Sequence, residues 1–443
     1  MFKKILIANR GEIALRILRA CRELNIKTVA IHSEADESAM HVRMADESVC
    51  VGPPSAQSSY LNIPAIITAA SLTNVDAIHP GYGFLSENKR FVEIIEEHNI
   101  KFIGPNSKHI ALMGNKIQAK KIMAENGIEN VPGLDAIRNV DDVKQFVKEV
   151  GLPVIIKAAN GGGGKGMRII RNIKDIEKSI ASAKIEAKKS FSDDTIYVEK
   201  FLETPKHIEI QILSDSFGNV LSLGERNCSI QRKHQKLIEE SPSADLNNEE
   251  RKKINELCIK VIKSIGYEGV GTLEFLYENN KFYFLEMNTR LQVEHTVTEM
   301  VTQKDLVKEQ ILVAYGEKLK DQQNGILIKG HSIQCRINAE NSETFIPSPG
   351  NIKQYHQPGG LGVRVDSAVY QGYSIPPHYD SMIAKLITFS DSRMDCIQKM
   401  KRALEEFVII GIDTNIQLHQ KIIQSEDFLK NNYDINYMSK YEI

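Results

Sequence analysis

The chain opens with apolar runs that alternate with amphipathic segments. The apolar run Lys4–Ala8 predicts a short strand, Glu12–Leu24 places apolar residues at helical spacing, and Thr28–His32 reads as a second strand. The same alternation continues through Ile63–Ser71, Ala77–His79, Phe91–Glu97 and Phe102–Ile103. Such an order predicts a doubly wound parallel sheet, with helices on both faces, over residues 1–113.

The pattern changes near Gly114, after which a smaller unit is expected over residues 114–202. It begins with a Lys-rich helix at Asn115–Asn126, and an amphipathic helix follows at Val140–Val150. The strands Pro153–Ala158 and Met167–Arg171 flank the glycine run Asn160–Gly166, and the helix Ile173–Lys189 and the strand Thr195–Glu199 complete the unit. Two strands joined by a glycine loop predict a mobile lid.

Strands dominate the remainder of the chain. A third region, residues 203–325, holds the predicted strands Lys206–Leu213, Val220–Glu225, Val270–Tyr277 and Lys281–Met287. The last region, residues 326–443, is β-rich, carries Pro-Gly turn signals such as Ser348-Pro349-Gly350, and is expected to close with the helix Arg393–Phe407. The fold class is therefore multidomain, α/β at the N-terminus and α+β beyond it.

Composition narrows the possible functions. The 443 residues hold 56 Lys+Arg against 57 Asp+Glu, so net charge gives no reason to expect nucleic acid or an anionic membrane as partner. No run approaches the roughly 18 apolar residues of a membrane span, and Asn9 and Arg10 interrupt the first apolar stretch too soon for a signal peptide. A cytoplasmic protein is expected. The six cysteines form no Cys-x-x-Cys pair, which predicts reduced thiols; Cys228, in a polar segment, is the one candidate for a reactive thiol, although an incidental thiol is favoured.

The glycine run Asn160–Gly166 is the most conspicuous local motif. Glycines let backbone N–H groups converge on an anion, which favours phosphate binding over the alternative of a plain surface loop. It is not a P-loop, because Lys165 precedes Gly166 instead of Ser or Thr and a strand follows. The first turn, Ala8–Glu12, has one glycine where the dinucleotide fingerprint has three, so a nicotinamide cofactor is disfavoured.

Acidic and basic side chains gather on a predicted hairpin around Asn279-Asn280. If the second strand stays extended, the alternate residues Glu286, Asn288, Arg290, Gln292 and Glu294 share one face. Oxygen ligands suit Mg²⁺, and Glu274, Glu286 and Asn288 are the candidate ligands. An odd-length turn would pair Glu274 with Glu286, whereas a two-residue turn would pair Glu274 with Leu285 unless a bulge shifts the register, and the sequence leaves this open.

Other candidates are individually weak. His207, Glu209 and Gln211 alternate with isoleucines, which indicates an amphipathic strand first and a ligand site second. The basic stretch Gln231–Lys236 could equally be a solvated loop. Lys116 and Lys157 are candidate phosphate contacts, but any single lysine is more often a solvated surface residue. His79–Phe84 follows a parallel strand at its carboxyl end, where such sheets bind ligands.

Together these motifs resemble the biotin carboxylase family over essentially the whole chain. The matching stretches are Ala8–Ala14, His79–Asn88, the lid glycines, Glu225–Arg232, Glu286–His295 and Arg336–Glu340. The resemblance implies an ATP-grasp fold whose lid closes over ATP. Two departures are Lys165, where Arg is common, and the absence of an Ala-Met-Lys-Met sequence that would hold biotin; the nearest string, Lys399–Arg402, reads as helix surface.

The resemblance also implies residue roles. Nucleotide contacts are expected from Lys116, Lys157, Gly163, Gly164, His207, Gln231 and His234 and from the stretch Glu199, Lys200, Phe201 and Leu202. Two Mg²⁺ or Mn²⁺ ions would be held by Glu274, Glu286 and Asn288. Bicarbonate would meet Lys236, Arg290, Gln292 and the backbone of Val293, with Glu294 as general base. Arg336 would face the ureido oxygen of biotin, near Tyr82 and Gly83.

The implied reaction is the ATP- and bicarbonate-dependent carboxylation of biotin through carboxyphosphate. With no carrier sequence and no length for a carboxyltransferase, the expected partners are a biotin carboxyl carrier protein, carboxyltransferase subunits and a second copy of the chain. Acetyl-CoA carboxylase of fatty acid synthesis is the favoured assembly, although the sequence does not name the final acceptor. Two alternatives stay open: another ATP-grasp carboxylate–amine ligase and a non-catalytic nucleotide-binding regulator.

Overall fold

The computed structural model describes residues 1–134, 137, 139–158, 167–191 and 194–441, in two compact units. The larger, here called the body, comprises Met1–Gly127, Lys206–Leu276 and Leu285–Ile443. The small unit comprises Ile128–Pro205 and the hairpin tip Tyr277–Phe284. The glycine run Asn160–Gly166 lies outside the described residues. The bounds of the four predicted domains remain predictions.

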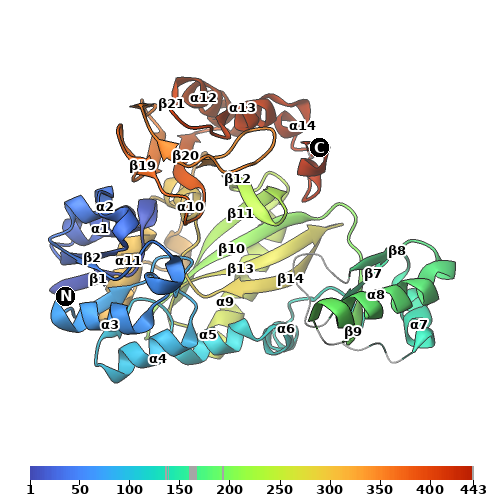
Figure 1. Ribbon diagram of the computed structural model, residues 1–443. Helices are drawn as coiled ribbons and strands as arrows, with labels where there is room; N and C mark the ends of the chain where they lie inside the picture. Colours follow the sequence, from blue (N-terminus) through green and yellow to red (C-terminus); the bar gives the residue numbers. More distant parts are fainter. Residues whose placement is uncertain (135–136, 138, 159–166, 192–193, 442–443) are drawn as a thin grey trace. The chain divides into compact units, whose positions relative to one another are not determined.

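A five-stranded parallel sheet opens the body, as the alternating pattern predicts (Figure 1). Its order is β3-β2-β1-β4-β5, with β1 Lys4–Ile7, β2 Lys27–His32, β3 Glu47–Cys50, β4 Ala77–His79 and β5 Lys101–Phe102. The helices of this region are α1 Gly11–Glu23, α2 Met40–Met44, α3 Ile63–Leu72, α4 Lys89–Glu97, α5 Ser107–Gly114 and α6 Lys116–Glu125. Ile5 and Ile7 of β1 face one core with α1, while Leu6 faces another with α3 and α4, so both faces are covered.

The first sheet brings two candidate turns together. Because β1 and β4 are neighbouring parallel strands, the residues after their carboxyl ends meet at one edge. Asn9 Nδ2 donates to the carbonyls of Pro80 and Tyr82, both at 2.7 Å. Gly81 and Gly83 adopt left-handed backbone, φ +62° and +71°, which shapes this turn.

An eight-stranded sheet forms the second layer of the fold, in the order β14-β13-β10-β11-β12-β15-β20-β18 (Figure 1). Its strands are β10 Lys206–Ser214, β11 Val220–Arg232, β12 Gln235–Ser241, β13 Gly269–Glu278, β14 Lys281–Asn288, β15 His331–Asn338, β18 Val363–Ser367 and β20 Met382–Ser390. The antiparallel pairing of β12 with β15 carries the sheet from the third predicted region into the fourth. Residues far apart in the sequence thereby come to lie on one sheet.

Helices and short ribbons flank this sheet. The helices are α9 Asn248–Ile265, α10 His295–Thr302, α11 Leu306–Tyr315, α12 Arg393–Glu406, α13 Ile416–Gln424 and α14 Glu426–Leu429, and the ribbons pair β16 Gly350–Asn351 with β19 Ser374–Ile375 and β17 Gln354–His356 with β21 Val408–Ile410. The predicted helix Arg393–Phe407 is present as α12, but the prediction that it closes the chain is wrong. Ile416, Ile422 and Phe428 of the following helices bury apolar side chains in the C-terminal core.

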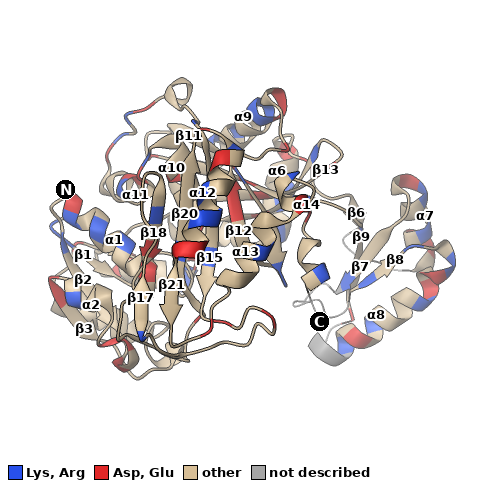
Figure 2. Ribbon diagram, turned by 90° about the horizontal axis from the view of Figure 1, so that it is seen from above, with Lys and Arg blue, Asp and Glu red and all other residues tan. Residues whose placement is uncertain are grey.

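The small unit is a four-stranded sheet, ordered β6-β9-β7-β8, with two helices. Its elements are β6 Gly133–Leu134, α7 Val140–Val150, β7 Val154–Ala158, β8 Arg168–Ile170, α8 Ile176–Phe191 and β9 Ile196–Lys200. A reciprocal capping box between Asn139 and Asp142 starts α7 at the residue that the sequence predicts. Figure 2 shows acidic and basic residues mixed along α7 and α8, as the balanced composition indicates. Over the described residues of both units, none of the helices is long and apolar enough to cross a membrane.

Candidate active site

Lys236 stands at the centre of a buried cluster of carboxylates. Its ammonium Nζ donates to Glu209 Oε2 at 2.6 Å, to Glu294 Oε1 at 2.7 Å and to Glu274 Oε1 at 3.0 Å. Burial would lower the pKa of Lys236, but the three carboxylates raise it well above its ordinary value, so the side chain is a fixed cation. Two triads of potential metal ligands, His207–Glu209–Glu274 and Glu209–Cys228–Glu294, share these carboxylates, and the ammonium already serves as their cation.

Arg226 supports the cluster from within the sheet. Its side chain is fully buried and pairs with Glu209, while its Nη1 donates to Gln211 Oε1 at 2.6 Å and to Thr298 Oγ1 at 3.0 Å. The register of β10 and β11 sets Glu209 directly opposite Arg226. The sequence alone favours an amphipathic strand here. The pairing of Glu209 with Arg226 explains why the polar face of this strand is buried instead of facing solvent.

The hairpin of β13 and β14 answers the question of register. Its turn has two residues, Asn279 and Asn280, both in left-handed backbone with φ of +52° and +59°. The side chains nevertheless match the pairing that an odd-length turn would give, because Asn288 Nδ2 donates to Glu274 Oε1 at 2.8 Å. Glu274 therefore lies on the face of Asn288, which Glu286, two residues earlier on the same strand, shares.

The segment from Glu286 to Glu294 does not stay extended, so the condition for one shared face is not met. Strand β14 ends at Asn288, and Glu294 immediately precedes helix α10. The chain turns between them, yet Gln292 Nε2 still donates to Glu274 Oε1 at 2.7 Å. The polar side chains thus converge through a turn and a helix start, which period-two spacing does not describe.

Glu294 and Arg336 form the second half of the cluster. Arg336 Nη2 donates to Glu294 Oε2 at 2.9 Å, so both oxygens of Glu294 accept from cations. Burial would raise the pKa of Glu294, but the nearby cations, Lys236 first, hold it well below its usual range. The two cations keep Glu294 ionised, which is the form that can accept a proton from a bound anion, and they also weaken it as a base for as long as both stay in contact with it.

Arg290 is held by a carboxylate that the sequence analysis did not single out. Its Nε donates to Glu87 Oε2 at 2.9 Å and its Nη2 to Asn288 Oδ1 at 2.9 Å, while Nη1 lies 3.1 Å from Gln292 Oε1. Glu87 also accepts from the backbone N–H of Thr289 at 2.8 Å. It lies in the matching stretch His79–Asn88, whose contact with the residues that follow β14 no local pattern reveals.

Further predicted residues of the body lie around the same sheet. His207 Nε2 is 2.8 Å from Glu274 Oε2, and its Nδ1 is 3.5 Å from Gln231 Nε2. His234 occupies the left-handed turn between β11 and β12, φ +65°. Lys116 Nζ is 4.0 Å from Glu286 Oε2. The structure therefore brings His207 and Gln231 to the cluster directly and Lys116 to its Glu286 edge.

The turn after β4 carries the residues predicted near biotin. The hydroxyl of Tyr82 donates a hydrogen bond to Glu12. Lys385 Nζ lies 3.1 Å from Glu12 Oε1 and donates to the carbonyl of Val293 at 3.2 Å. Lys385 is fully buried. Through Glu12, Lys385 links the backbone next to Glu294 to Tyr82, in the turn that also contains Gly83.

The predicted residues of the small unit form a set of their own. Lys157 Nζ pairs with Glu199 Oε2 at 2.6 Å across the neighbouring strands β7 and β9. Lys200 Nζ donates to the carbonyl of Leu152 at 2.9 Å, and Leu202 is buried. Phe201 lies under the guanidinium of Arg171 at 5.6 Å. Gly163 and Gly164 lie outside the described residues.

Cys228 is not a reactive thiol. Its side chain is buried, with Sγ 4.0 Å from Glu294 Oε1, and burial first and the neighbouring Glu209 second raise its pKa well above the ordinary value. The thiol therefore stays protonated beside the carboxylates. Of the other carboxylates here, the sequence pattern indicated Glu209 as a strand residue first and a ligand second, and it did not indicate Glu87.

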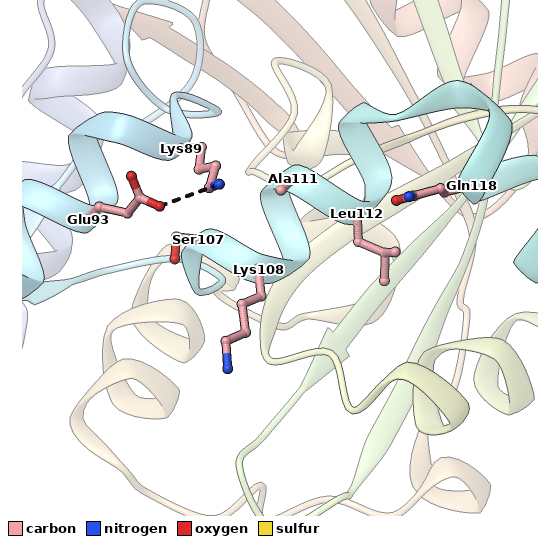
Figure 3. A pocket seen from close by; sticks show the side chains of 7 residues that line it. All are labelled: Lys89, Glu93, Ser107, Lys108, Ala111, Leu112 and Gln118. Atoms are coloured by element: carbon pink, nitrogen blue, oxygen red, sulfur yellow. Dashed lines mark ion pairs between the residues drawn. The ribbon is translucent and has the colours of Figure 1, made fainter.

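A surface depression of about 470 Å³ lies elsewhere on the body, between α4 and α5 (Figure 3). Lys89 and Glu93 form an ion pair of 3.5 Å on its wall, and Ser107 and Lys108 begin its other side. No predicted site residue lines it. The buried cluster at Lys236, and not this depression, holds the candidate chemistry.

Three family models match consecutive parts of the chain. The family model "Biotin carboxylase, N-terminal domain" matches residues 1–110, "Carbamoyl-phosphate synthase L chain, ATP binding domain" matches residues 115–322, and "Biotin carboxylase C-terminal domain" matches residues 334–440. A curated biotin carboxylase of Haemophilus influenzae is 54% identical over 442 residues, covering 99% of each chain.

Two solved structures extend the comparison. The biotin carboxylase of Campylobacter jejuni, solved as a β-γ-ATP complex, has a TM-score of 0.92 and 52% identity, with 99% of each chain covered. The biotin carboxylase domain dimer of the 2-oxoglutarate carboxylase of Hydrogenobacter thermophilus, solved with MgADP, ADP and bicarbonate, has a TM-score of 0.90 and 47% identity, covering 100% of this chain and 98% of that one. The chain belongs to the biotin carboxylase family of ATP-dependent ligases.

Proposed function

We propose that this protein carboxylates biotin on a separate carrier protein, using ATP and bicarbonate, as the first half-reaction of a multi-subunit carboxylase. The observation that carries the proposal is the cluster of Lys236, Glu294 and Arg336, in which one buried carboxylate contacts two cations. Family membership supplies the reaction class, and this cluster supplies groups suited to an anionic substrate with a proton to lose.

In the first step, bicarbonate binds near Lys236, Arg290, Gln292 and the backbone of Val293. Glu294 accepts the proton as a bicarbonate oxygen attacks the γ-phosphorus of ATP, which releases ADP and forms carboxyphosphate. Since both substrates are anions, fixed cations at this point lower the barrier mainly by electrostatics and positioning. The raised pKa of Lys236 keeps that charge constant over the working pH range.

The proposed metal ligands fit a hard divalent cation. Glu274, Glu286 and Asn288 present oxygen atoms from one face of a hairpin, the donor type that Mg²⁺ and Mn²⁺ prefer. Desolvation and the neighbouring Glu274 raise the pKa of Glu286, whose side chain is 43% exposed, so a cation there relieves a like-charge contact. When bound, such ions neutralise phosphate charge. His207, Gln231, His234 and Lys116 in the body, and Lys157 and Glu199–Leu202 in the small unit, are the proposed nucleotide contacts.

In the second step, carboxyphosphate breaks down to CO₂ and phosphate, phosphate takes the proton of the ureido nitrogen, and that nitrogen attacks CO₂. Arg336 stabilises the negative charge that develops on the ureido oxygen. Arginine suits this role because its charge is permanent and its donors are fixed in one plane. Tyr82 and Gly83 are proposed to border the biotin ring.

The partners follow from the same reaction. A carrier protein must bring biotin, and carboxyltransferase subunits must use the product. A Haemophilus influenzae relative that the chain matches over 99% of the relative's length is named biotin carboxylase, which supports the biotin carboxylase half-reaction as the proposed activity. We propose acetyl-CoA carboxylase as the assembly, a homodimer as the functional form, and the cytoplasm as the compartment. The relative from a 2-oxoglutarate carboxylase shows that the family serves other acceptors.

An ADP-release assay with bicarbonate and biotin omitted in turn tests the proposal. Bicarbonate-dependent ADP release that free biotin stimulates is the expected result, whereas a carboxylate–amine ligase would respond to neither and a regulator would release no ADP. Glu294→Gln should abolish the bicarbonate-dependent rate, and Arg336→Ala should spare much of it while impairing biotin carboxylation. Equal losses of both reactions in Arg336→Ala would reject the placement of that residue at biotin.

A further inference from the structure

Arg336 is held by a second buried carboxylate, Glu239, on the strand beside it. Its Nε donates to Glu239 Oε1 at 2.5 Å, while its Nη2 donates to Glu294. The other oxygen of Glu239 accepts from Gln334 Nε2 at 3.0 Å. One guanidinium therefore bridges two carboxylates through two different edges of its plane.

The contacts around Glu239 close into a ring that returns to Glu294. Thr296, in the first turn of α10 and two residues after Glu294, donates through Oγ1 to Gln334 Oε1. Gln334 lies directly opposite Glu239 in the register of β12 and β15, two strands that run side by side (Figure 2). The ring thus fixes the position of Arg336 relative to the helix start that carries Glu294.

Burial makes the ring costly to leave incomplete. Glu239, Gln334, Thr296 and Glu294 are each fully buried, and the Arg336 side chain is 17% exposed. An unpaired charge at such a place is strongly unfavourable, so a guanidinium that released Glu294 would stay bound to Glu239. A carboxylate that is already paired and hydrogen-bonded can in turn hold the arginine without help from Glu294.

We propose that Glu239 is a positioning residue for biotin, holding Arg336 by its Nε edge so that its Nη edge can exchange Glu294 for the ureido oxygen. The exchange leaves the guanidinium in its plane and place, and it frees Glu294 from one of its two cations. Gln334 supports this arrangement by orienting Glu239. The inference rests on the proposed function, since it takes Arg336 as the residue that meets biotin.

A purely structural role for Glu239 makes a different prediction. If the carboxylate only neutralises a buried arginine, its loss should lower stability and reduce every activity together. The next residue offers a matched control. Glu240, fully buried on the opposite face of β12, accepts from His331 Nε2 at 2.7 Å and from Arg393 Nε at 2.8 Å, and it touches no proposed site residue.

The test compares Glu239→Gln, Glu240→Gln, Arg336→Ala and the double variant Glu239→Gln/Arg336→Ala in the intact chain, with free biotin as substrate. For Glu239→Gln, kcat/KM for biotin carboxylation should fall about 10- to 100-fold, the usual consequence of removing a charged hydrogen-bond partner. The bicarbonate-dependent ADP release without biotin should fall less than that. In the Arg336→Ala background, Glu239→Gln should lower kcat/KM for biotin carboxylation by less than a further factor of about two, because a residue that acts through Arg336 has nothing left to position.

Glu240→Gln, assayed below its melting temperature, should change kcat/KM for biotin by less than about threefold, which separates positioning from general destabilisation. Full additivity of Glu239→Gln with Arg336→Ala would overturn the inference, as would an unchanged kcat/KM for biotin in Glu239→Gln. Should that variant fail to fold, Gln334→Met removes one hydrogen bond from Glu239 while keeping its charge, and an unchanged kcat/KM there would be equally decisive. If the wild-type chain itself does not carboxylate biotin, the proposed function fails instead.

Discussion

Buried histidines should make the protein lose stability between about pH 6.5 and pH 4. His419 is fully buried in the C-terminal region, where its Nε2 lies 2.7 Å from the carbonyl of Arg336. Burial lowers the pKa of His419 from 6.5 to about 4, and the same cause lowers the pKa of His41 to about 4 and of His79 to about 3. Each ring stays neutral in the folded chain at a pH where the unfolded chain binds a proton.

The sign and size of the effect follow from proton linkage. Because the unfolded state binds more protons between the two pKa values, stability is fully present above pH 6.5 and falls as pH decreases. With a folded pKa of about 4, the free energy of unfolding that His419 contributes drops by about 2 kcal/mol between pH 8 and pH 5. The raised pKa values of Glu12 and Glu239 act in the opposite direction, so a variant is needed to isolate the histidine.

His419→Gln keeps a side-chain N–H for the carbonyl of Arg336 but does not titrate. The chain has no tryptophan, so unfolding in urea is best followed by far-ultraviolet circular dichroism at pH 8 and pH 5. The difference in unfolding free energy between the two pH values should be about 2 kcal/mol smaller in His419→Gln than in wild type. His98→Gln, at an exposed position, serves as control. An equal pH dependence in wild type and His419→Gln would refute the reasoning.

Four further substitutions address other parts of the structure. Glu209→Gln should lower stability by about 3 to 5 kcal/mol, measured in urea, because it leaves the buried Arg226 without its carboxylate. Glu286→Gln should lose divalent-metal-dependent turnover with no change in melting temperature, and unchanged kinetics across a Mn²⁺ titration would count against the metal assignment. Cys228→Ser should keep its activity after treatment with a thiol reagent as wild type does, since the protonated, buried thiol is inert. Glu240→Gln should destabilise the chain most above about pH 5, because the stability that comes from the lowered pKa of Glu240 is complete above the unfolded-state pKa of 4.5 and is lost as the pH falls, and a loss that grows at lower pH would contradict this.

Local patterns predicted the elements of the fold well, because each rests on short-range physics. The first sheet followed from the alternation of apolar strands and amphipathic helices, and α7 began and ended where its apolar spacing predicted. The glycine-rich stretch, by contrast, falls outside the described residues. The helices after α12 were missed because Ile416–Gln424 is short and lies beyond a segment with strong turn signals.

The site was predictable only as far as residue types were concerned. Spacing suggested a carboxylate face on the hairpin, but the turn at Asn279 and the helix start at Glu294 decide which side chains meet. Glu239 was missed for a plain reason. It stands beside Glu240 in strand β12, whose sequence does not alternate between apolar and polar residues, and its partner Arg336 is 97 residues away in the sequence. A single sequence does not encode such a pairing in any local pattern.

The charges of the buried cluster point to what must bind with the substrates. Four carboxylates, those of Glu209, Glu239, Glu274 and Glu294, face three cations, those of Lys236, Arg226 and Arg336. A surplus of negative charge in a water-poor site disfavours a further anion unless a cation arrives with it. Bicarbonate and the phosphates of ATP are both anions, so we infer that divalent cations at the Glu274–Glu286 edge are a condition for their binding and not only an aid to chemistry. On this argument the apparent affinity for bicarbonate should weaken when Mg²⁺ is withheld from the ATP-bound protein, and an affinity independent of Mg²⁺ would mean that Lys236 and Arg290 suffice to compensate the anion.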